Sequence, residues 1–434
     1  FQSAGFGLTI SGMSPNVYER YARPGLLEAL ADTPAVLIHG PRQSGKTTLA
    51  LEISQDEGFV SYSFDDANLV ATAQADPMGF VAELPAKAIL DEVQRVPEIF
   101  APLKLAIDRD RQPGRFLLTG STNVLLVPGL SDSLAGRMEI VRLHSLAQCE
   151  IERTRPDFLD RLFEGAFPST DFGRLGSELM ERIVAGGFPA ALARPQIRRR
   201  RAWYQAYLES LVQRDVRDMA QLSHLDVVPR LLAVAASQTA RLFNVSDLAS
   251  PFQVSRPTIR DYLVLLERIF VLELLPPWHT NQLSRLVKTP KLHLSDTGLA
   301  SAVLGLDVAA LAKDRDLLGR LLETFVVGEL RRQSSWADAA SVTFHHFRDR
   351  DGLEVDLILE RNGREIAGVE VKASGTVTDA DFRALRHLRD SLGERFRSGV
   401  VLYDGDRSLS FGGRMYAVPI RALWADSVSV GRRE

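Results

Sequence analysis

Two glycines, a lysine and a threonine stand close together near the start of the sequence, at a spacing suited to binding phosphate. Gly40 follows an apolar segment at 35–39, and four residues later come Gly45, Lys46 and Thr47. Glycines let backbone N–H groups close around a phosphate at the start of a helix, where the helix dipole also favours an anion. We therefore predict a nucleoside triphosphate site, with Lys46 on the phosphates and Thr47 on Mg²⁺. The residues of this phosphate loop expected to contact the nucleotide are Gly40, Pro41, Arg42, Gln43, Ser44, Gly45, Lys46, Thr47 and Thr48.

Two acidic residues stand together at the end of a second apolar segment. Residues 88–90 are Ala, Ile and Leu, and Asp91 and Glu92 follow them. A carboxylate at the end of a strand can hold Mg²⁺ through its water shell, and a second one can orient and polarise a water for attack on a phosphate. We assign Asp91 to the metal and Glu92 to the water. The two motifs together predict an enzyme that binds and hydrolyses ATP with Mg²⁺.

A third group of charged residues lies near the other end of the chain and has the composition of a metal site. Glu370 and Lys372 are two residues apart on an apolar strand, so they point to the same side. Asp356 lies on the preceding strand, and Glu323 lies inside an amphipathic helix. This set of residues resembles the core of PD-(D/E)xK nucleases. The resemblance implies that Asp356 and Glu370 share a second Mg²⁺ or Mn²⁺, with Glu323 nearby, and that Lys372 positions or helps to deprotonate a water for attack on a phosphodiester. The alternative is a nuclease fold that does not cut.

Whether Asp356 lies beside Glu370 depends on the register of the two strands. A two-residue turn at 362–363 would place Asp356 opposite Val369, on the apolar face. One extra residue restores the phase, either in a three-residue loop or in a bulge at Gly368. We predict such an irregularity.

The composition is that of an ordinary globular protein. A length of 434 residues predicts about three domains. Apolar residues make up 45% and charged residues 25%, which excludes a disordered or fibrous protein. The formal charge of −3 gives no overall attraction to nucleic acid or to an anionic membrane, so only a local patch could bind either. The single cysteine, Cys149, and the lack of a long apolar run predict a cytoplasmic protein without a membrane span.

Nine segments of the sequence occur in an order that resembles one family. The chain resembles the prokaryotic AAA-type (AAA+) ATPases that carry a C-terminal domain of unknown function, over roughly residues 15–405. The segments that carry the resemblance are HGPRQSGKTT, LDEVQRVPEIF, FLLTGSTN, SLAGR, GGFPAAL, LVQRDVRD, SDTGLA, LLETFVVGEL and EVDLIL followed by VEVKAS.

The resemblance implies an α/β fold with four parts. These are a P-loop AAA+ core, in which helices sandwich a parallel sheet, a helical lid, a winged-helix domain, and a C-terminal domain similar to PD-(D/E)xK nucleases. The expected divisions are 1–13 for a leader that looks like a tag remnant, 14–145 for the core, 146–225 for the lid, 226–290 for the winged helix and 291–434 for the nuclease-like domain.

Two more residues of the front site follow from the resemblance. In this order of motifs a polar residue after the third strand senses the γ-phosphate, and Ser121, ahead of Asn123, is our candidate. Arg137 follows a glycine and precedes a strand, so it is a candidate for the arginine that completes a neighbouring subunit's site. The alternatives are ordinary turn residues and an ordinary surface arginine. An arginine supplied by a neighbour implies a homo-oligomer, for which a ring is a natural form.

Two segments in the middle of the chain are candidates for contact with DNA. Arg198–Arg201 form a basic run, although a solvated helix face is the commoner explanation. Residues 244–278 read as helix, turn, helix and strand, the pattern of a winged helix, with Ser246 and Ser255 as helix caps. The alternative is that this module packs against the ATPase or a protein partner. The side chains expected at the start of the second helix are Ser255, Arg256, Thr258 and Arg260.

Two classes of function fit these observations. The first is an ATP-hydrolysing machine that acts on DNA through the winged helix and the nuclease-like domain, with metal-dependent cleavage left open. The second is a nucleotide-switched regulatory protein, in which the same two parts recognise a protein partner and cut nothing. Turnover stimulated by DNA would favour the first class. Very slow turnover with ATP-dependent partner binding would favour the second.

Overall fold

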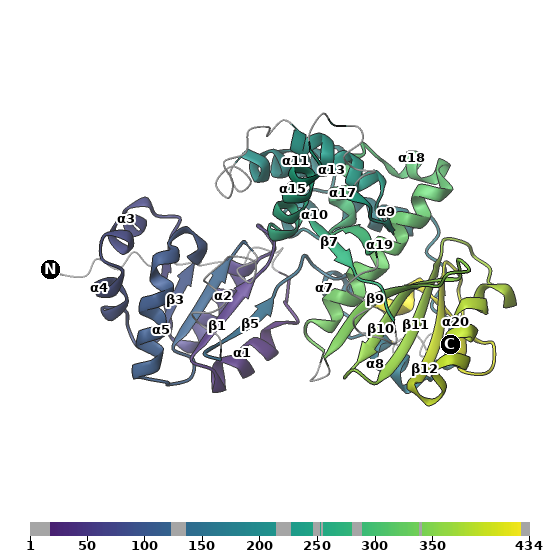
Figure 1. Cartoon of the computed structure of the whole chain (residues 1–434), viewed down its shortest axis with the longest axis horizontal. Coiled ribbons are helices and arrows are strands. Elements are labelled where there is room, and N and C mark those ends of the chain that lie inside the picture. The colour runs from purple at the N-terminus through teal and green to yellow at the C-terminus, as the bar shows by residue number, and fades with distance from the viewer. Residues whose placement is uncertain are drawn as a thin grey trace.

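The computed structural model describes most of the chain, in several segments. These are residues 18–122, 136–213, 227–245, 252, 255–279, 289–337 and 341–426. The predictions for residues 1–13, for Asn123 and for Ser246 lie outside the described residues. Figure 1 shows one sheet with its helices on the left, a helical region at the upper right and a second large sheet at the lower right.

The left-hand part is a five-stranded sheet in the order β2-β3-β4-β1-β5, in which all paired strands are parallel. The three inner strands are buried along their whole length, as strands covered on both faces must be. The strands are β1 Ala35–His39, β2 Val60–Ser63, β3 Ala88–Asp91, β4 Phe116–Gly120 and β5 Met138–Arg142.

Helices cover both faces of this sheet. Leu37 of β1 packs with α3 Ala67–Ala75, α4 Pro77–Ala82 and α5 Phe100–Arg109. Its neighbours Val36 and Ile38 point the other way and pack with α1 Arg23–Asp32 and α2 Lys46–Glu57. The predicted parallel sheet between two helical layers is therefore present. The carboxyl ends of β1 and β3 lead directly into the phosphate loop and to Glu92.

A small antiparallel sheet in the order β6-β8-β7 lies between the two larger parts of the molecule. Helix α15 precedes β7, and the predicted cap is present, because the hydroxyl of Ser255 accepts a hydrogen bond from the N–H of Thr258 at 3.3 Å. Ile259 and Leu266 bury one face of the helix. We call these four elements the small-sheet module: β6 Arg241–Leu242, α15 Arg256–Arg268, β7 Leu272–Leu275 and β8 Lys291–Leu294.

The C-terminal part is a six-stranded mixed sheet in the order β13-β14-β12-β11-β10-β9. Helix α19 Arg315–Ser334 packs on one face through residues such as Leu321, and helix α20 Arg383–Leu392 packs on the other through Leu385. The strands are β9 Val342–Arg348, β10 Glu354–Arg361, β11 Glu365–Lys372, β12 Phe396–Tyr403, β13 Leu409–Ser410 and β14 Met415–Pro419.

One helix of the middle packs on the C-terminal sheet. Helix α8 Phe158–Glu164 lies under that sheet (Figure 1), and the hydroxyl of Ser398 in β12 donates to the carbonyl oxygen of Leu162 at 2.5 Å. The division expected for a lid at 146–225 stays a prediction. The other helices of this region are α7 Gln148–Glu152, α9 Ser177–Ala185, α10 Pro189–Leu192, α11 Ile197–Leu211, α13 Val227–Ser237, α17 Thr297–Val303 and α18 Val308–Lys313. Within the described residues, none of the helices is long and apolar enough to cross a membrane.

Candidate functional site

The phosphate loop joins the end of β1 to the start of α2, and its shape requires glycine at two positions. A Cβ atom on Gly40 would lie 2.1 Å from the carbonyl oxygen of Leu143, so no side chain fits there. Gly45, the residue before α2, has a φ of 99°, a backbone conformation that favours glycine. The two glycines therefore bend the chain so that the loop wraps over the start of the helix.

The lysine and a serine of the loop point into it. Lys46 is buried, and its Nζ donates to the carbonyl oxygens of Gly40 and Pro41 at 3.0 and 2.9 Å. The hydroxyl of Ser44 is buried without a hydrogen-bond partner. Buried hydroxyls normally have partners, so this one is a group that a bound phosphate can satisfy. The loop thus fits the triphosphate that its sequence predicts.

The two residues predicted to hold Mg²⁺ lie side by side. The Thr47 hydroxyl donates to Oδ1 of Asp91 at 2.9 Å, and the hydroxyls of Thr119 and Ser63 donate to the same carboxylate. Burial raises the pKa of Asp91 above its usual value, and the hydrogen bonds from Thr119 and Thr47 offset part of that rise. A hydroxyl and a carboxylate are both ligands that Mg²⁺ accepts.

Glu92 is held in a defined orientation beside this pair. Its φ is 58°, an unusual value for a residue with a side chain, and its N–H donates to the Thr119 hydroxyl at 3.1 Å. Oε2 of Glu92 accepts hydrogen bonds from the Ser121 hydroxyl at 2.8 Å and from the Gln94 amide. Ser121, our candidate for the phosphate sensor, is therefore in contact with the carboxylate that would orient the attacking water.

Arg137 forms an ion pair within its own chain. Its Nε lies 2.7 Å from Oδ1 of Asp108 in α5, and a second guanidinium nitrogen lies 3.0 Å from the other carboxylate oxygen. The hydrogen bond from Arg137 lowers the pKa of Asp108. To reach a nucleotide in a neighbouring subunit, Arg137 would have to exchange this carboxylate for a phosphate.

Two residues from outside the loop hold its backbone, and the motifs of the sequence did not single them out. The buried guanidinium of Arg20 donates to the carbonyl oxygen of Ser44 at 2.6 Å and is fixed by Glu150 at 2.9 Å. The hydroxyl of Tyr207, in α11, donates to the carbonyl oxygen of Arg42 at 3.2 Å. Because Tyr207 is 165 residues away from Arg42 in the chain, no local spacing could have indicated the contact.

The end of β1 also contacts the small-sheet module. His39, the residue before Gly40, lies edge-on to Phe270 with 5.3 Å between ring centroids. Burial, helped by Arg142, lowers the pKa of His39 to about 3, so the ring is neutral at pH 7. Glu273 of β7 bridges Arg142 of β5 and Arg331 of α19. The end of β1, which leads into the phosphate loop, is therefore packed directly against the small-sheet module.

At the C-terminal site, the strand register is the one that the sequence required. Leu357 lies opposite Val369 and Arg361 opposite Glu365, so the connection at 362–364 has three residues. The predicted irregularity is confirmed in its loop form. A second irregularity lies between β10 and β9, where the register shifts between Val355 and Ile358. Because of it, Val355 packs on the face of α20, whereas Leu357, two residues later, packs on the face of α19.

The carboxylates of this site gather around an ammonium group that the sequence analysis did not assign. Nζ of Lys291, in β8, lies 2.6 Å from Glu354, 2.8 Å from Glu323 and 3.4 Å from Asp356. The Lys291 side chain is only 3% exposed. Oδ2 of Asp356 accepts a hydrogen bond from the N–H of Val371 at 3.0 Å, next to Glu370 in β11. We call Glu323, Glu354, Asp356 and Glu370 the carboxylate cluster.

Burial and mutual repulsion govern the protonation of this cluster. Burial raises the pKa of Glu323 well above its usual range, with a further contribution from Asp356 and an opposing one from Lys291. Burial also raises the pKa of Glu370, again with help from Asp356. For Lys291, burial alone would lower the pKa, but the carboxylates of Glu323, Asp356 and Glu354 outweigh it and raise the pKa.

Lys372, the predicted water-positioning lysine, is paired elsewhere. Its Nζ lies 2.7 Å from Oδ1 of Asp381, in the 3-10 helix Asp379–Phe382 that precedes α20. Among the described residues, no group of three or more His, Cys, Asp and Glu side chains is placed to hold a metal ion. The second metal site that the sequence suggested does not fit the residues present, because Lys291 lies against two of its carboxylates, Glu323 and Asp356.

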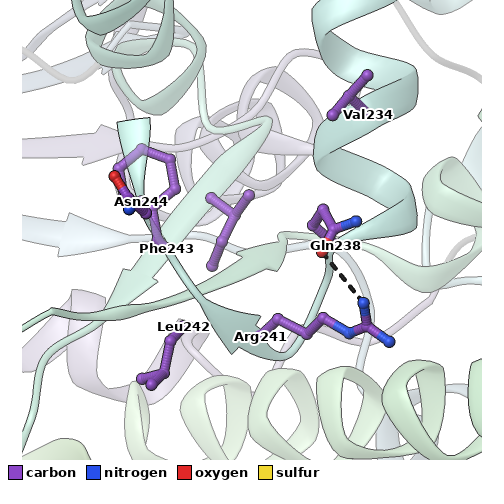
Figure 2. Close-up of a pocket in the computed structure, with 7 residues that line it drawn as sticks. Val234, Gln238, Arg241, Leu242, Phe243 and Asn244 are labelled. Carbon is purple, nitrogen blue, oxygen red and sulfur yellow. Dashed lines mark hydrogen bonds between the residues drawn. The ribbon is translucent and has the colours of Figure 1, made fainter. Parts of the chain in front are cut away.

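A separate concavity lies on the small-sheet module. Figure 2 shows it between α13 and β6, with Gln238 and Arg241 hydrogen-bonded at one side and Phe243 at the other. A neighbouring groove is lined mainly by apolar side chains, among them Leu263 and Val264 of α15. Neither concavity is lined by residues of the phosphate loop or of the carboxylate cluster.

Comparison with known protein families divides the chain into three matched regions. Residues 32–152 match the AAA domain, and residues 176–310 and 318–423 match the domains of unknown function DUF8612 and DUF4143. Lys291 thus belongs to the second region, and the four carboxylates belong to the third. The phosphate loop, Asp91 and Glu92 all lie within the AAA match.

Two relatives match this chain over most of its length and most of their own. The uncharacterized protein Rv2008c of Mycobacterium tuberculosis is 30% identical over 406 residues, which are 93% of this chain and 84% of the relative. Mb2031c of Mycobacterium bovis matches equally well. Among solved structures, a Walker-type ATPase of Pyrococcus abyssi is 17% identical over 66% of this chain and 96% of its own, with a TM-score of 0.38. The RuvB Holliday junction branch migration motor of Thermotoga maritima is 18% identical over 59% of this chain and 89% of its own, with a TM-score of 0.27. The chain belongs to the same family as the two mycobacterial proteins, and its first domain is an AAA-type ATPase domain.

Proposed function

We propose that the first domain binds ATP and hydrolyses it with Mg²⁺. The observation that carries this proposal is the hydrogen bond of 2.9 Å between Thr47 and Asp91, with Glu92 directly beside it. Thr47 and Asp91 would hold Mg²⁺, which when bound neutralises charge on the phosphates. Lys46 would exchange the carbonyl oxygens that it now contacts for phosphate oxygens, which adds a charge-assisted hydrogen bond.

Glu92 would orient and polarise the attacking water. The hydrogen bonds from Ser121 and Gln94 to Oε2 fix its carboxylate, and a carboxylate has about four acceptor sites, so it can still accept a bond from water. Ser121 therefore acts in this proposal through Glu92 and serves as a positioning residue. A shift of Ser121 toward the γ-phosphate would change the orientation of Glu92, which would link sensing to catalysis.

The test is phosphate release by Glu92→Gln, with ATP binding measured on the same protein. We expect turnover to fall by about 10²-fold or more while ATP still binds, because only the polarisation of water is lost. Glu98→Gln is the matched control, since Glu98 is an exposed acid on the neighbouring 3-10 helix Pro97–Ile99. Unchanged turnover in Glu92→Gln would refute the assignment.

We further propose that the protein acts as a homo-oligomer, with Arg137 completing a neighbour's site. Its support is the position of Arg137 just before β5 and the exchangeable pair with Asp108. Arg137→Ala should then lower turnover without weakening ATP binding. A mixture of Arg137→Ala with Glu92→Gln subunits should recover part of the activity, because some interfaces combine an intact glutamate with an intact arginine. No recovery in mixed oligomers would place Arg137 outside the site.

We also propose that DNA is contacted by the start of α15. The support for this proposal is the capped amphipathic helix α15, followed by β7, and the exposure of Ser255, Arg256 and Arg260 at its start. Arg256→Ala with Arg260→Ala should weaken DNA binding in a gel-shift assay and reduce its dependence on salt. Arg111→Ala, an exposed arginine of the first domain, is the control. Equal binding by both variants would argue against this surface.

A nucleotide-switched protein that binds a protein partner is the second candidate function. The apolar groove beside α15 favours it, because Val264 is 36% exposed there and an apolar lining offers little to DNA phosphates. The deciding measurement is the ATP turnover of the wild type with and without DNA. Stimulation supports the DNA-directed machine, whereas turnover that stays very slow with any DNA supports the switch.

A further inference from the structure

The carboxylate cluster has the acids of a metal site but contains a cation of its own. Glu323 lies in α19, Glu354 and Asp356 in β10, and Glu370 in β11, and the Lys291 ammonium from β8 lies against the first three. The distances of 2.6 and 2.8 Å to Glu354 and Glu323 are those of charge-assisted hydrogen bonds. A buried ammonium and buried carboxylates are each costly alone, so they must be satisfied together.

We propose that Lys291 takes the place of a divalent metal ion in this cluster, so that the C-terminal domain is held by an internal ion pair and does not cut phosphodiesters. A metal ion would need to contact several of these carboxylates at about 2.0–2.6 Å, where the Lys291 side chain now stands. The water-positioning role also lacks its lysine, because Lys372 is paired with Asp381.

The arrangement makes Lys291 a connection between two regions of the chain. It is the first residue of β8, which pairs with β6 and β7, while its partners belong to α19 and to the C-terminal sheet. Lys291 is thus a positioning residue that joins the small-sheet module to the C-terminal domain. This inference concerns the C-terminal site and does not depend on the proposed ATP hydrolysis.

The test is Mn²⁺ binding, followed by electron paramagnetic resonance on nucleotide-free full-length protein. Asp91→Asn is introduced in every sample to weaken metal binding at the front site. With Lys291 intact, we expect the Asp91→Asn protein to have no Mn²⁺ site that depends on Asp356. When Lys291→Met is added to Asp91→Asn, we expect the protein to gain about one Mn²⁺ per chain. A further Asp356→Asn change should abolish the gained site. Circular dichroism confirms that each variant is folded.

Two results would overturn the proposal. One is activity of the cluster as a metal site while Lys291 is intact. It would appear as an Mn²⁺ site that Asp356→Asn removes, or as cleavage of supercoiled DNA by wild type that Asp356→Asn abolishes. The other is a folded Lys291→Met protein that gains no Mn²⁺ site. If Lys291→Met does not fold, the protein with Lys291 intact decides the question by itself, since the absence of an Asp356-dependent site supports the proposal and its presence refutes it.

Discussion

The phosphate loop and the carboxylate cluster both combine a buried lysine with nearby acids, but the lysines have different partners. Lys46 donates to two neutral carbonyl oxygens, whereas Lys291 lies against three carboxylates. Replacing a carbonyl by a phosphate adds an ion pair, while withdrawing Lys291 would leave buried charges without a counter-ion. A buried lysine near acids therefore indicates a ligand site only when the ligand would offer the ammonium group stronger contacts than its present ones.

Lys46→Ala should give the largest effect and should act on function. We expect ATP turnover to fall by about 10²-fold or more, because the charge that meets the phosphates is lost. The free energy of unfolding without nucleotide should change by about 1 kcal/mol at most, as the lost contacts are to carbonyls. Lys87→Ala, at a half-exposed lysine of the same domain, is the control. Equal turnover in the two variants would show that Lys46 has no special role in ATP turnover, and the contrast with Lys291 would be wrong.

Lys291→Met should act on stability instead. Removing one partner of a buried ion-pair group costs about 3–5 kcal/mol, because the carboxylates stay behind without compensation. Adding Asp356→Asn should recover part of this loss, since a neutral amide tolerates burial better than an unpaired carboxylate. Urea unfolding of the single and double variants measures both values. A loss below about 1 kcal/mol in the single variant would show that the ion pair is replaceable.

The two sites should respond to pH with opposite signs. His39, with its pKa lowered to about 3, takes up its proton only on unfolding, so the free energy of unfolding falls as pH drops from 6.5 toward 3. Glu323 has a raised pKa, so the folded state holds a proton that the unfolded state has lost, and its contribution falls as pH rises above 4.5. Each slope is at most about 1.4 kcal/mol per pH unit.

Variants of His39 and Glu323 distinguish their two contributions to the pH dependence of the free energy of unfolding. His39→Asn should flatten the loss of stability below pH 6.5, and Glu323→Gln should flatten the loss above pH 4.5. Urea titrations between pH 4.5 and 8 give both curves. If His39→Asn shows the same acid limb as wild type, other buried histidines such as His293, whose pKa is also lowered by burial, account for it.

Lys372→Ala should give the smallest effect. The pair with Asp381 is partly exposed, so its loss should cost less than about 1 kcal/mol in the free energy of unfolding. DNA should remain uncut by wild type and variant alike on gels with Mg²⁺ or Mn²⁺, with or without ATP. Cutting by wild type that Lys372→Ala abolishes would make the C-terminal domain a nuclease and would remove the distinction between the two sites.

The sequence predicted the parts of the site that depend on short-range spacing. Gly40, Gly45 and Lys46 lie in the single loop between β1 and α2, and the parallel order of the strands brings Asp91 to the same edge as Thr47. The register of β10 and β11 was also within reach, because a polar Asp356 on an apolar face would be costly. In each case the local chemistry leaves few alternatives.

The contacts that were missed depend on segments far apart in the chain. Tyr207 reaches the phosphate loop across 165 residues, and Lys291 lies 65 residues from Asp356. Helix α8 packs on β12, and the seven residues of the helix contain no local signal for that partner. The register shift before Ile358 depends on β9 and likewise has no local signature.

Buried ion pairs link the small-sheet module to both of its neighbours. Swinging the module away from the C-terminal domain would separate Lys291 from its carboxylates. Swinging it away from the first domain would separate Glu273 of β7 from Arg142 of β5, beside the aromatic edge contact between His39 and Phe270. A rearrangement of the phosphate loop that shifts β1 and β5 should therefore carry the module and the C-terminal domain along as one stiff unit.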